Sequence, residues 1–209
     1  MKDRDRYGVW EEEDCTYLTA GYGDLDKLKR TRMEISKYIK EELNPQGITL
    51  DFGSGMGLIA REIAPCVKEL HCCDISSTFL QKAQENCSGL SNVSYHLIDP
   101  GELKFPDGSF DSIYSVAVFI HFSLMEVYHH FREFYRILKP GGKALFNIYL
   151  ASNFHLENFV GAYEEVYRTP NRWVLQTPPH DETVVRKLLA HVGFTCDHPP
   201  GRWYMLIQK

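Results

Sequence analysis

Long hydrophobic runs are absent from this sequence. No uninterrupted apolar stretch approaches the roughly 20 residues that a membrane-spanning helix needs. The amino terminus, MKDRDRYGVW, is charged and lacks the apolar core of a secretory signal. These two absences predict a cytoplasmic protein with no membrane partner.

Basic residues are also fewer than acidic ones. The chain has 23 Lys and Arg against 28 Asp and Glu, which gives a formal net charge of −5 at pH 7. It contains no cluster of about five or more consecutive basic residues. A nucleic-acid partner is therefore not expected, because binding to phosphates depends on Lys and Arg. A small neutral or cationic partner fits this charge balance better.

Paired metal-binding cysteines are missing as well. The 209 residues include six cysteines, but none forms a C-x-x-C motif. Cys72 and Cys73 are adjacent within an expected strand, so their side chains face opposite sides. We expect buried, reduced thiols and no metal site, with zinc or redox chemistry as the alternative.

Short apolar runs alternate with helical patterns from about residue 48 onward. The runs ITLDF, ELHCCD, VSYHLID, FDSIYSVAVF and KALFNIYL predict five strands buried on both faces. The segments between them, GLIAREIAPCV, SSTFLQKAQENC and LMEVYHHFREFYRILK, predict helices. This alternation is typical of an α/β fold with right-handed crossovers and a mainly parallel sheet.

The helix expected after the fourth strand has a clear start and one apolar face. Ser123 is a candidate N-cap, and the LKPGG sequence is expected to end the helix before the fifth strand. The residues expected on its packed face are Met125, Tyr128, Phe131, Phe134, Tyr135 and Leu138. His129 and His130 are interpreted as surface or packing residues. In the segment FPDGSFD, Asp107 and Gly108 indicate a turn. Asp111 is expected to hold the backbone in place at the start of the fourth strand.

The chain is predicted to be one domain, 1–209, with four parts. Residues 1–45 form an N-terminal cap and helix, and 46–150 form a cofactor-binding core. Residues 151–175 form an aromatic insertion over the substrate, and 176–209 a helix followed by two strands. FTCDH and RWYMLIQK, joined by a PPG turn, are expected to pair antiparallel at the sheet edge.

The stretch LDFGSGMGLIA, residues 50–60, carries the strongest functional signal. Its glycines follow an expected strand and open an expected helix, where a ligand can approach the backbone closely. A second acid, Asp74, ends the next strand at the distance typical of a ribose-binding acid. Asp51 at the head of the turn would repel a pyrophosphate and attract an ammonium group. The pattern favours a cofactor that combines a nucleoside with positive charge.

These features resemble the class I S-adenosylmethionine-dependent methyltransferases of the small-molecule type. Four blocks appear in the expected order: LDFGSGMG, CDIS, IDPGELKFPDGSFDSIYS and ILKPGG. The resemblance implies a three-layer, Rossmann-like fold, with helices on both faces of a seven-stranded, mostly parallel sheet whose last strand is antiparallel. It also implies S-adenosylmethionine as cofactor, S-adenosylhomocysteine as product, and transfer of a methyl group to an N or O atom of a small-molecule acceptor.

The resemblance also assigns cofactor-binding residues. They are Asp51, Gly53, Ser54, Gly55, Gly57, Asp74, Ile75, Asp99, Pro100 and Ser115. The glycines and Ser54 would surround the methionine part, and Asp51 would orient the turn or an ammonium-bound water. Asp74 would bind the ribose, Ile75 would pack on adenine, and Asp99 would accept from its amino group. Pro100 departs from the family, because it has no N–H to offer the adenine ring; the N–H of Gly101 is the candidate replacement.

The sequence gives fewer indications of which residues bind the methyl acceptor. His121, just after the fourth strand, is the candidate general base, with a loop-packing role as the alternative. Aromatic and histidine residues in the two variable segments are expected to bind the substrate: Tyr7, Trp10, Tyr17, Tyr22, His155, Phe159 and Tyr163. The alternative is that these residues are ordinary core. The oligomeric state stays open, with a homodimer as one option.

Three other functions compete with small-molecule methylation. A nicotinamide-dependent oxidoreductase shares the sheet, but the leading acid and the glycine spacing disfavour it. A methyltransferase acting on protein or RNA is the second, with the acidic balance against RNA. The third is a non-catalytic module that binds S-adenosylmethionine.

Overall fold

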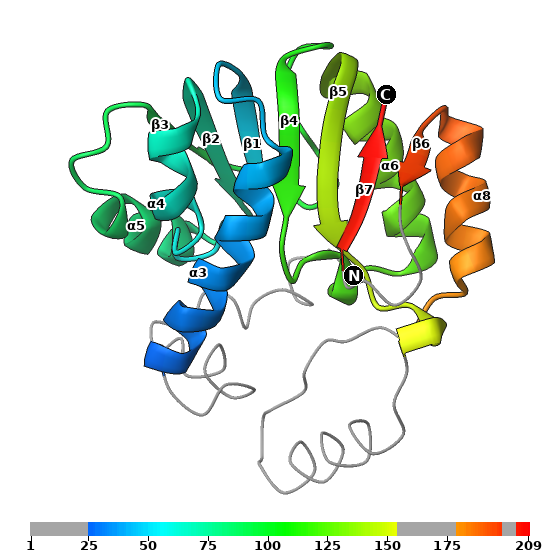
Figure 1. The fold of residues 1–209 in the computed structure, drawn as a ribbon, viewed down its shortest axis with the longest axis horizontal. Helices are drawn as coiled ribbons and strands as arrows, with labels where there is room; N and C mark the ends of the chain where they lie inside the picture. The colour runs from blue at the N-terminus through cyan, green and yellow to red at the C-terminus, as the bar shows by residue number, and fades with distance from the viewer. Residues whose placement is uncertain (1–24, 154–178, 198–203) are drawn as a thin grey trace, which may run out of the picture.

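A seven-stranded sheet forms the centre of the computed structural model, which describes residues 25–153, 179–197 and 204–209. The strands are β1 (Ile48–Phe52), β2 (Glu69–Asp74), β3 (Val93–Leu97), β4 (Phe110–Ser115), β5 (Leu138–Asn147), β6 (Thr195–Asp197) and β7 (Tyr204–Gln208). Their order is β3-β2-β1-β4-β5-β7-β6 (Figure 1). The pairs from β3 to β5 are parallel, and β7 is antiparallel to both of its neighbours. The predicted α/β sheet and the antiparallel pairing of the last two strands are confirmed.

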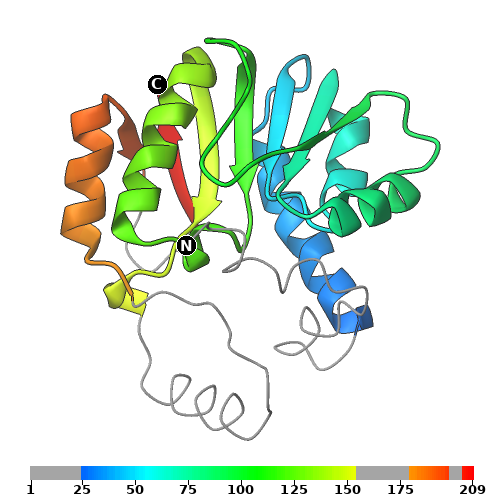
Figure 2. The same ribbon diagram turned by 180° about the vertical axis from the view of Figure 1, so that it is seen from behind.

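Helices cover both faces of this sheet. The α-helices are α3 (Leu25–Glu42), α4 (Ala60–Ile63), α5 (Ser77–Asn86), α6 (Leu124–Ile137) and α8 (Glu182–Val192). Short 3-10 helices span Ala64–Cys66, Phe119–His121 and Ala151–Asn153. Helices α3 and α4 lie on the near face in Figure 1, and α6 and α8 lie on the opposite face (Figure 2). The predicted three-layer, Rossmann-like architecture is therefore present.

Successive side chains of the strands point to opposite faces of the sheet and pack into two separate hydrophobic cores. Leu50, Phe52 and Cys73 belong to the core under α6 and α8, whereas Cys72 and Tyr114 belong to the core under α3 and α4. The two adjacent cysteines thus face opposite sides and are both fully buried, as predicted. Among the residues that the structure describes, the cysteines are free thiols. The thiol of Cys15 lies outside the described residues.

The outer strand β3 does not fit the expectation of burial on both faces. Each of its residues is half-buried or exposed, and Leu97 is 60% exposed. The physical reason is its place at the edge of the sheet, where fewer elements can cover it. The prediction of a strand was right, and the prediction of its full burial was wrong.

Helix α6 begins as predicted, but its buried face is shifted. Ser123 caps the helix, and Glu126 completes a reciprocal capping box. Met125 is 78% exposed, so its assignment to the packed face was wrong. It lies two residues before the buried Val127, which places it on the opposite side of the helix. The buried residues of the helix are Val127, His130, Phe131, Phe134 and Ile137.

Three expected elements are shorter at their ends than their sequence patterns. The strand read through Phe119 ends at Ser115, because Ala117 adopts a positive φ of 62° and its N–H donates to the Asn147 side chain at 2.6 Å. The helix expected after the glycine turn ends at Ile63 and continues as a 3-10 turn that contains Pro65. Likewise, α6 ends at Ile137, three residues before Pro140.

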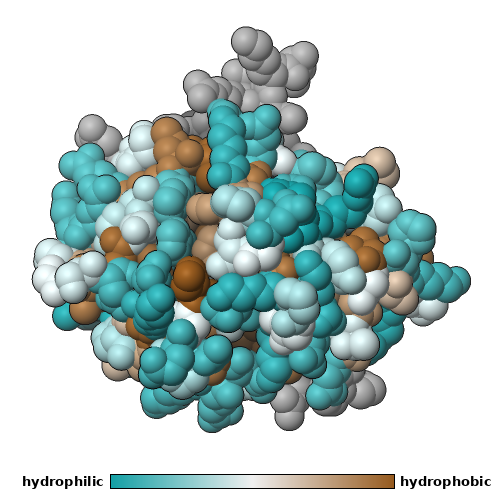
Figure 3. Space-filling model, turned by 90° about the horizontal axis from the view of Figure 1, so that it is seen from above, coloured by the Kyte–Doolittle hydropathy of each residue, from teal (hydrophilic) through white to brown (hydrophobic). Residues whose placement is uncertain are grey.

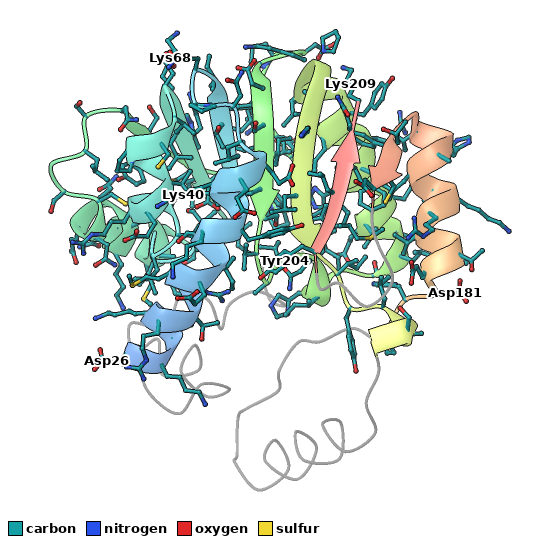
Figure 4. All side chains as sticks on the ribbon, in the orientation of Figure 1. Asp26, Lys40, Lys68, Asp181, Tyr204 and Lys209 are labelled. Atoms are coloured by element: carbon teal, nitrogen blue, oxygen red, sulfur yellow. The ribbon has the colours of Figure 1, made fainter. Side chains whose placement is uncertain are left out.

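The two ends of the sheet differ in their surroundings. The face seen from above in Figure 3 carries mainly hydrophilic residues with scattered hydrophobic ones. Lys68 and Lys209 lie at this end, while Asp26, Asp181 and Tyr204 lie at the opposite end (Figure 4).

Asp111 lies at the start of β4. Its carboxylate accepts from the backbone N–H of Ile48 at 2.8 Å and from Lys139 at 2.6 Å, which confirms its predicted backbone role. No described helix is long and apolar enough to cross a bilayer.

The predicted substrate-binding aromatic residues are not among those described. Tyr7, Trp10, Tyr17 and Tyr22 lie in 1–24, and His155, Phe159 and Tyr163 lie in 154–178. Their roles stay predictions.

His130 is a histidine buried in an aromatic cluster. It is 4% exposed, and its ring lies 4.6 Å from that of Phe122 and 4.9 Å from that of Phe52. Its Nδ1 has no hydrogen-bond partner among the described residues. Burial, and secondarily the nearby His129, lower the pKa of His130 to about 4. The side chain is therefore neutral near pH 7 and acts as a packing residue.

Protonation of His130 is expected to weaken the fold in acid. The unfolded chain takes up this proton near pH 6.5, whereas the folded chain resists it until about pH 4, so stability is lost as pH falls through that window. The His130→Phe variant should lack this loss, with its stability relative to wild type rising by about 2 kcal/mol between pH 7 and pH 5. Urea unfolding at both pH values measures it. The control is His191→Gln, which replaces an exposed histidine on α8. An equal change in the free energy of unfolding between pH 7 and pH 5 in wild type and His130→Phe would contradict the account.

Candidate active site

The glycine turn after β1 is held by the end of β2. The backbone N–H groups of Gly53 and Ser54 both donate to the carbonyl of Cys73, at 2.9 and 3.0 Å. The N–H of Gly55 donates to Asp74 Oδ2 at 2.8 Å, and that of Gly57 to the Ser54 carbonyl at 3.0 Å. The turn lies at the carboxyl ends of the parallel strands, the edge where open α/β sheets bind ligands.

Three glycines of this turn have positive φ, but their surroundings differ. A Cβ on Gly53 would clash with the side chain of Val118, and one on Gly57 would lie 2.9 Å from the Cβ of Ala83 on α5. A Cβ on Gly55 would meet no atom of the described residues within 4 Å. Gly53 and Gly57 are therefore required for packing, whereas Gly55 borders open space beside the turn.

Asp74 connects the turn to the start of α5. Its Oδ1 accepts from the N–H of Ser76 at 3.0 Å, while its Oδ2 accepts from Gly55. Ser76 in turn caps α5 through a hydrogen bond from Phe79 N. The carboxyl group is 7% exposed. The predicted ribose acid thus also fixes the conformation of the turn, a role that its position in the sequence did not indicate.

Asp99 is brought to the same edge by β3. The N–H of Ile98 donates to the Asp74 carbonyl at 3.0 Å, so the chain runs beside Asp74 just before Asp99. Asp99 is about half exposed, and Lys104 lies 3.7 Å from its Oδ2. Pro100 and Gly101 follow in a turn closed by a hydrogen bond from Glu102 N to Asp99 O. Ile75 is half-buried, and its packing on adenine stays a prediction, as does the contact of Asp99 with the adenine amino group.

Asp51 lies beneath the turn in a buried position. It is 3% exposed, and the hydroxyl of Tyr114 donates to its Oδ2 at 2.9 Å. Burial is the main reason that the pKa of Asp51 rises to about 8, and the neighbouring Asp74 carboxylate adds to it. The site therefore contains two buried acids close together at the end of β1 and β2.

Comparison with known proteins bears on this arrangement. Residues 50–146 match the family model described as a methyltransferase domain. The chain is 31% identical over 150 residues to a phosphoethanolamine N-methyltransferase of Plasmodium falciparum, which covers 71% of this chain and 53% of the relative. It is 31% identical over 118 residues to a demethylmenaquinone methyltransferase of Tropheryma whipplei, covering 56% and 46%. The chain thus spans about half the length of these curated relatives.

A solved structure agrees with the observed fold. The magnesium protoporphyrin IX methyltransferase of Synechocystis PCC 6803, with bound S-adenosylhomocysteine (SAH), superposes with a TM-score of 0.69 at 16% identity. The match covers 97% of this chain and 96% of that one. At this identity the likeness shows the fold alone. Residues 50–146 therefore form a methyltransferase domain, and the described sheet and helices have the class I, Rossmann-like fold. The resemblance stated from the sequence is confirmed.

The methyltransferase domain offers groups that fit S-adenosylmethionine. Ser54 Oγ is buried and has no partner among the described residues, so a hydroxyl is available to a polar ligand at the turn. Gly55 borders open space, and the acids Asp51 and Asp74 suit a cofactor that carries an ammonium group and ribose hydroxyls. This donor and acceptor set matches the methionine and nucleoside ends of the cofactor.

Two further predicted site residues are His121, which follows β4, and Ser115, which is the last residue of β4. His121 ends the 3-10 helix Phe119–His121 and is half-buried. Ser115 is fully buried, and its hydroxyl donates to the Phe52 carbonyl at 2.9 Å, joining β4 to β1. This bond gives Ser115 a structural role behind the turn. Its contact with the cofactor stays a prediction, as does the catalytic role of His121.

Sequence reasoning missed two residues that shape the site. Tyr114 holds the carboxyl group of Asp51, and Val118 packs against Gly53. A tyrosine within a buried strand has the ordinary appearance of core. No local feature of the sequence marks it, because the buried partner that its hydroxyl needs is supplied by the pairing of β4 with β1 in the structure.

Substitution of single glycines should separate packing from cofactor binding. Gly53→Ala should destabilise the fold by more than about 2 kcal/mol, since the Val118 clash adds to the strain of positive φ. Gly55→Ala should cost only the strain, about 1–2 kcal/mol, yet abolish the rise in melting temperature that SAH causes. Thermal unfolding with and without SAH measures both.

A matched control is available in the Asp107–Gly108 turn. Gly108 also has positive φ and no atom within 4 Å of an added Cβ. Gly108→Ala should cost as much stability as Gly55→Ala and keep the full response to SAH. Equal responses of the two variants would show that Gly55 does not border the cofactor.

Proposed function

We propose that this chain transfers a methyl group from S-adenosylmethionine to an N or O atom of a small-molecule acceptor. The observation that carries the proposal is the acid-led glycine turn, with Gly55 beside open space and Asp74 bonded across it. A nicotinamide dinucleotide suits this site less well, because its pyrophosphate would lie near the buried Asp74 carboxylate.

Each end of the cofactor has candidate partners. The backbone from Gly53 to Gly57 and the Ser54 hydroxyl would hold the methionine part. The Asp74 carboxylate, which already accepts from the N–H groups of Gly55 and Ser76, would also accept from the ribose hydroxyls. Asp99 would accept from the adenine amino group, in place of its contact with Lys104.

The relatives favour a small acceptor. The names of the two curated relatives give phosphoethanolamine and demethylmenaquinone as substrates, neither of which is a macromolecule. The chain covers about half of each relative, so its own acceptor is inferred only as a class. The variable segments 1–24 and 154–178, rich in aromatic residues, are the part of the sequence expected to enclose it.

The chemistry requires positioning more than conspicuous catalysts. When bound, S-adenosylmethionine supplies a methyl group on a positively charged sulfur, which the lone pair of an acceptor displaces in line. The chain's own contribution is to orient the two molecules and exclude water, which can lower a barrier by about 7–11 kcal/mol. For a hydroxyl acceptor, an imidazole nitrogen of His121 would take the proton that the acceptor loses.

The direct test uses S-adenosylmethionine labelled on its methyl group, mixed with purified protein and a fractionated cell extract. The proposal expects label in the low-molecular-weight fraction, with none when the Asp74→Ala variant replaces the wild type. Label in protein or RNA would overturn the proposed acceptor class. No label in any fraction, with SAH binding shown separately, would favour a non-catalytic binding module.

Replacement of His121 tests the proposed base once an acceptor is identified. For a hydroxyl acceptor, His121→Gln should lower kcat by about 100-fold or more, the usual contribution of a general base, with SAH affinity unchanged. Steady-state kinetics and calorimetry provide the two measurements, with His191→Gln on α8 as the control. A fully active His121→Gln enzyme would rule out the base role.

A further inference from the structure

Asp51 and Tyr114 are direct neighbours in the sheet. They occupy the same register position of β1 and β4, so both side chains project to the face covered by α3 and α4. Tyr114 is fully buried and Asp51 is 3% exposed, and the hydroxyl of the tyrosine donates to Asp51 Oδ2 at 2.9 Å. The pair forms a buried hydrogen bond beneath the glycine turn.

The surroundings of Asp51 hold little positive charge. The titratable and charged groups that face it from the described elements are Cys72, Cys73 and Asp74 on β2, Tyr114 on β4, Cys87 after α5 and Arg32 on α3. Burial raises the pKa of Asp51 and Asp74 raises it further, while Tyr114 and Arg32 act in the opposite direction without cancelling it. In the free protein, Asp51 therefore holds a proton at neutral pH.

A cationic ligand would change this balance. The amino group of S-adenosylmethionine or SAH is a cation at neutral pH, and an opposite charge within about 4–6 Å favours the ionised carboxylate. With Oδ2 bonded to Tyr114, the second oxygen of Asp51 is the one left for that amino group. The hydroxyl of Tyr114 also stabilises the carboxylate as it forms, because hydrogen bonds to charged acceptors are the strong ones.

We propose that Asp51 and Tyr114 form a proton-coupled positioning pair, in which binding of the cofactor's ammonium group drives the Asp51 proton into solvent while Tyr114 holds the carboxylate in place. The inference rests on the proposed function, because it needs the cofactor to bind at this turn. The reaction is balanced: the carboxylic acid becomes a carboxylate, the buffer takes the proton, and the ammonium group stays protonated. Tyr114 is a positioning residue that acts through Asp51.

Calorimetry of SAH binding tests the pair without any acceptor. Titrations at pH 7 in buffers of different ionisation enthalpy give the number of protons released. Wild type should release most of one proton at pH 7, and less as the pH rises past 8. Asp51→Asn should release none and bind SAH with an affinity that no longer depends on pH in this range. An unchanged proton number in Asp51→Asn would overturn the proposal.

Tyr114→Phe separates positioning from a simple structural role. Loss of the hydroxyl removes an interaction that lowers the pKa of Asp51, so SAH affinity at pH 7 should fall about tenfold or more, and the pH dependence of affinity should move to higher pH. Tyr95→Phe, a partly buried tyrosine on β3 that bonds Cys87 instead, is the matched control and should keep the wild-type profile. A uniform loss of affinity at all pH values in Tyr114→Phe would contradict the proposal.

The outcomes also distinguish this proposal from the one on which it rests. SAH binding by wild type without proton release would overturn the pair and leave the proposed function intact. Absence of SAH binding by wild type at every pH would overturn the proposed function and the pair with it. Should Tyr114→Phe fail to fold, the proton number of wild type against Asp51→Asn still decides the question.

Discussion

The hydrogen bonds that tie the turn after β1 to the end of β2 are the interaction on which the site depends. Three successive N–H groups of the turn, from Gly53 to Gly55, are satisfied by the Cys73 carbonyl and the Asp74 carboxylate. This geometry requires positive φ at the glycines and brings the turn against Val118 and Ala83. As a result, Asp74 is fixed at the edge of the sheet, with Asp51 buried just below. The same contacts that build the turn thus concentrate acidic groups where a cationic cofactor would bind.

Most of the fold could be predicted from local sequence patterns. The β1 to β5 strands, the α3 and α8 helices and the Ser123 cap follow from apolar periodicity and capping residues, because these features depend on near neighbours in the chain. The turn and its two acids could also be predicted, since a glycine-rich connection between strand and helix is needed for close ligand approach. The overall topology then followed from the family resemblance, which the domain match and the fold both support.

The errors came from contacts between segments far apart in the chain. The exposure of Leu97 reflects the edge position of β3. The early end of β4 depends on Asn147, 30 residues after Ala117. Tyr114 meets Asp51 across 63 residues, and nothing local distinguishes it from an ordinary core tyrosine. Such partners are set by strand pairing and register, which a single sequence leaves undetermined.

The most direct test of the account is a calorimetric titration of the purified chain with SAH, repeated with NAD and with the Asp74→Ala variant. The account predicts one SAH site per chain, no measurable binding of NAD, and much weaker SAH binding by Asp74→Ala, because the variant loses both the ribose contact and the bond to Gly55. Binding of NAD in place of SAH, or equal SAH affinity in wild type and Asp74→Ala, would contradict the assignment of this edge of the sheet as the cofactor site.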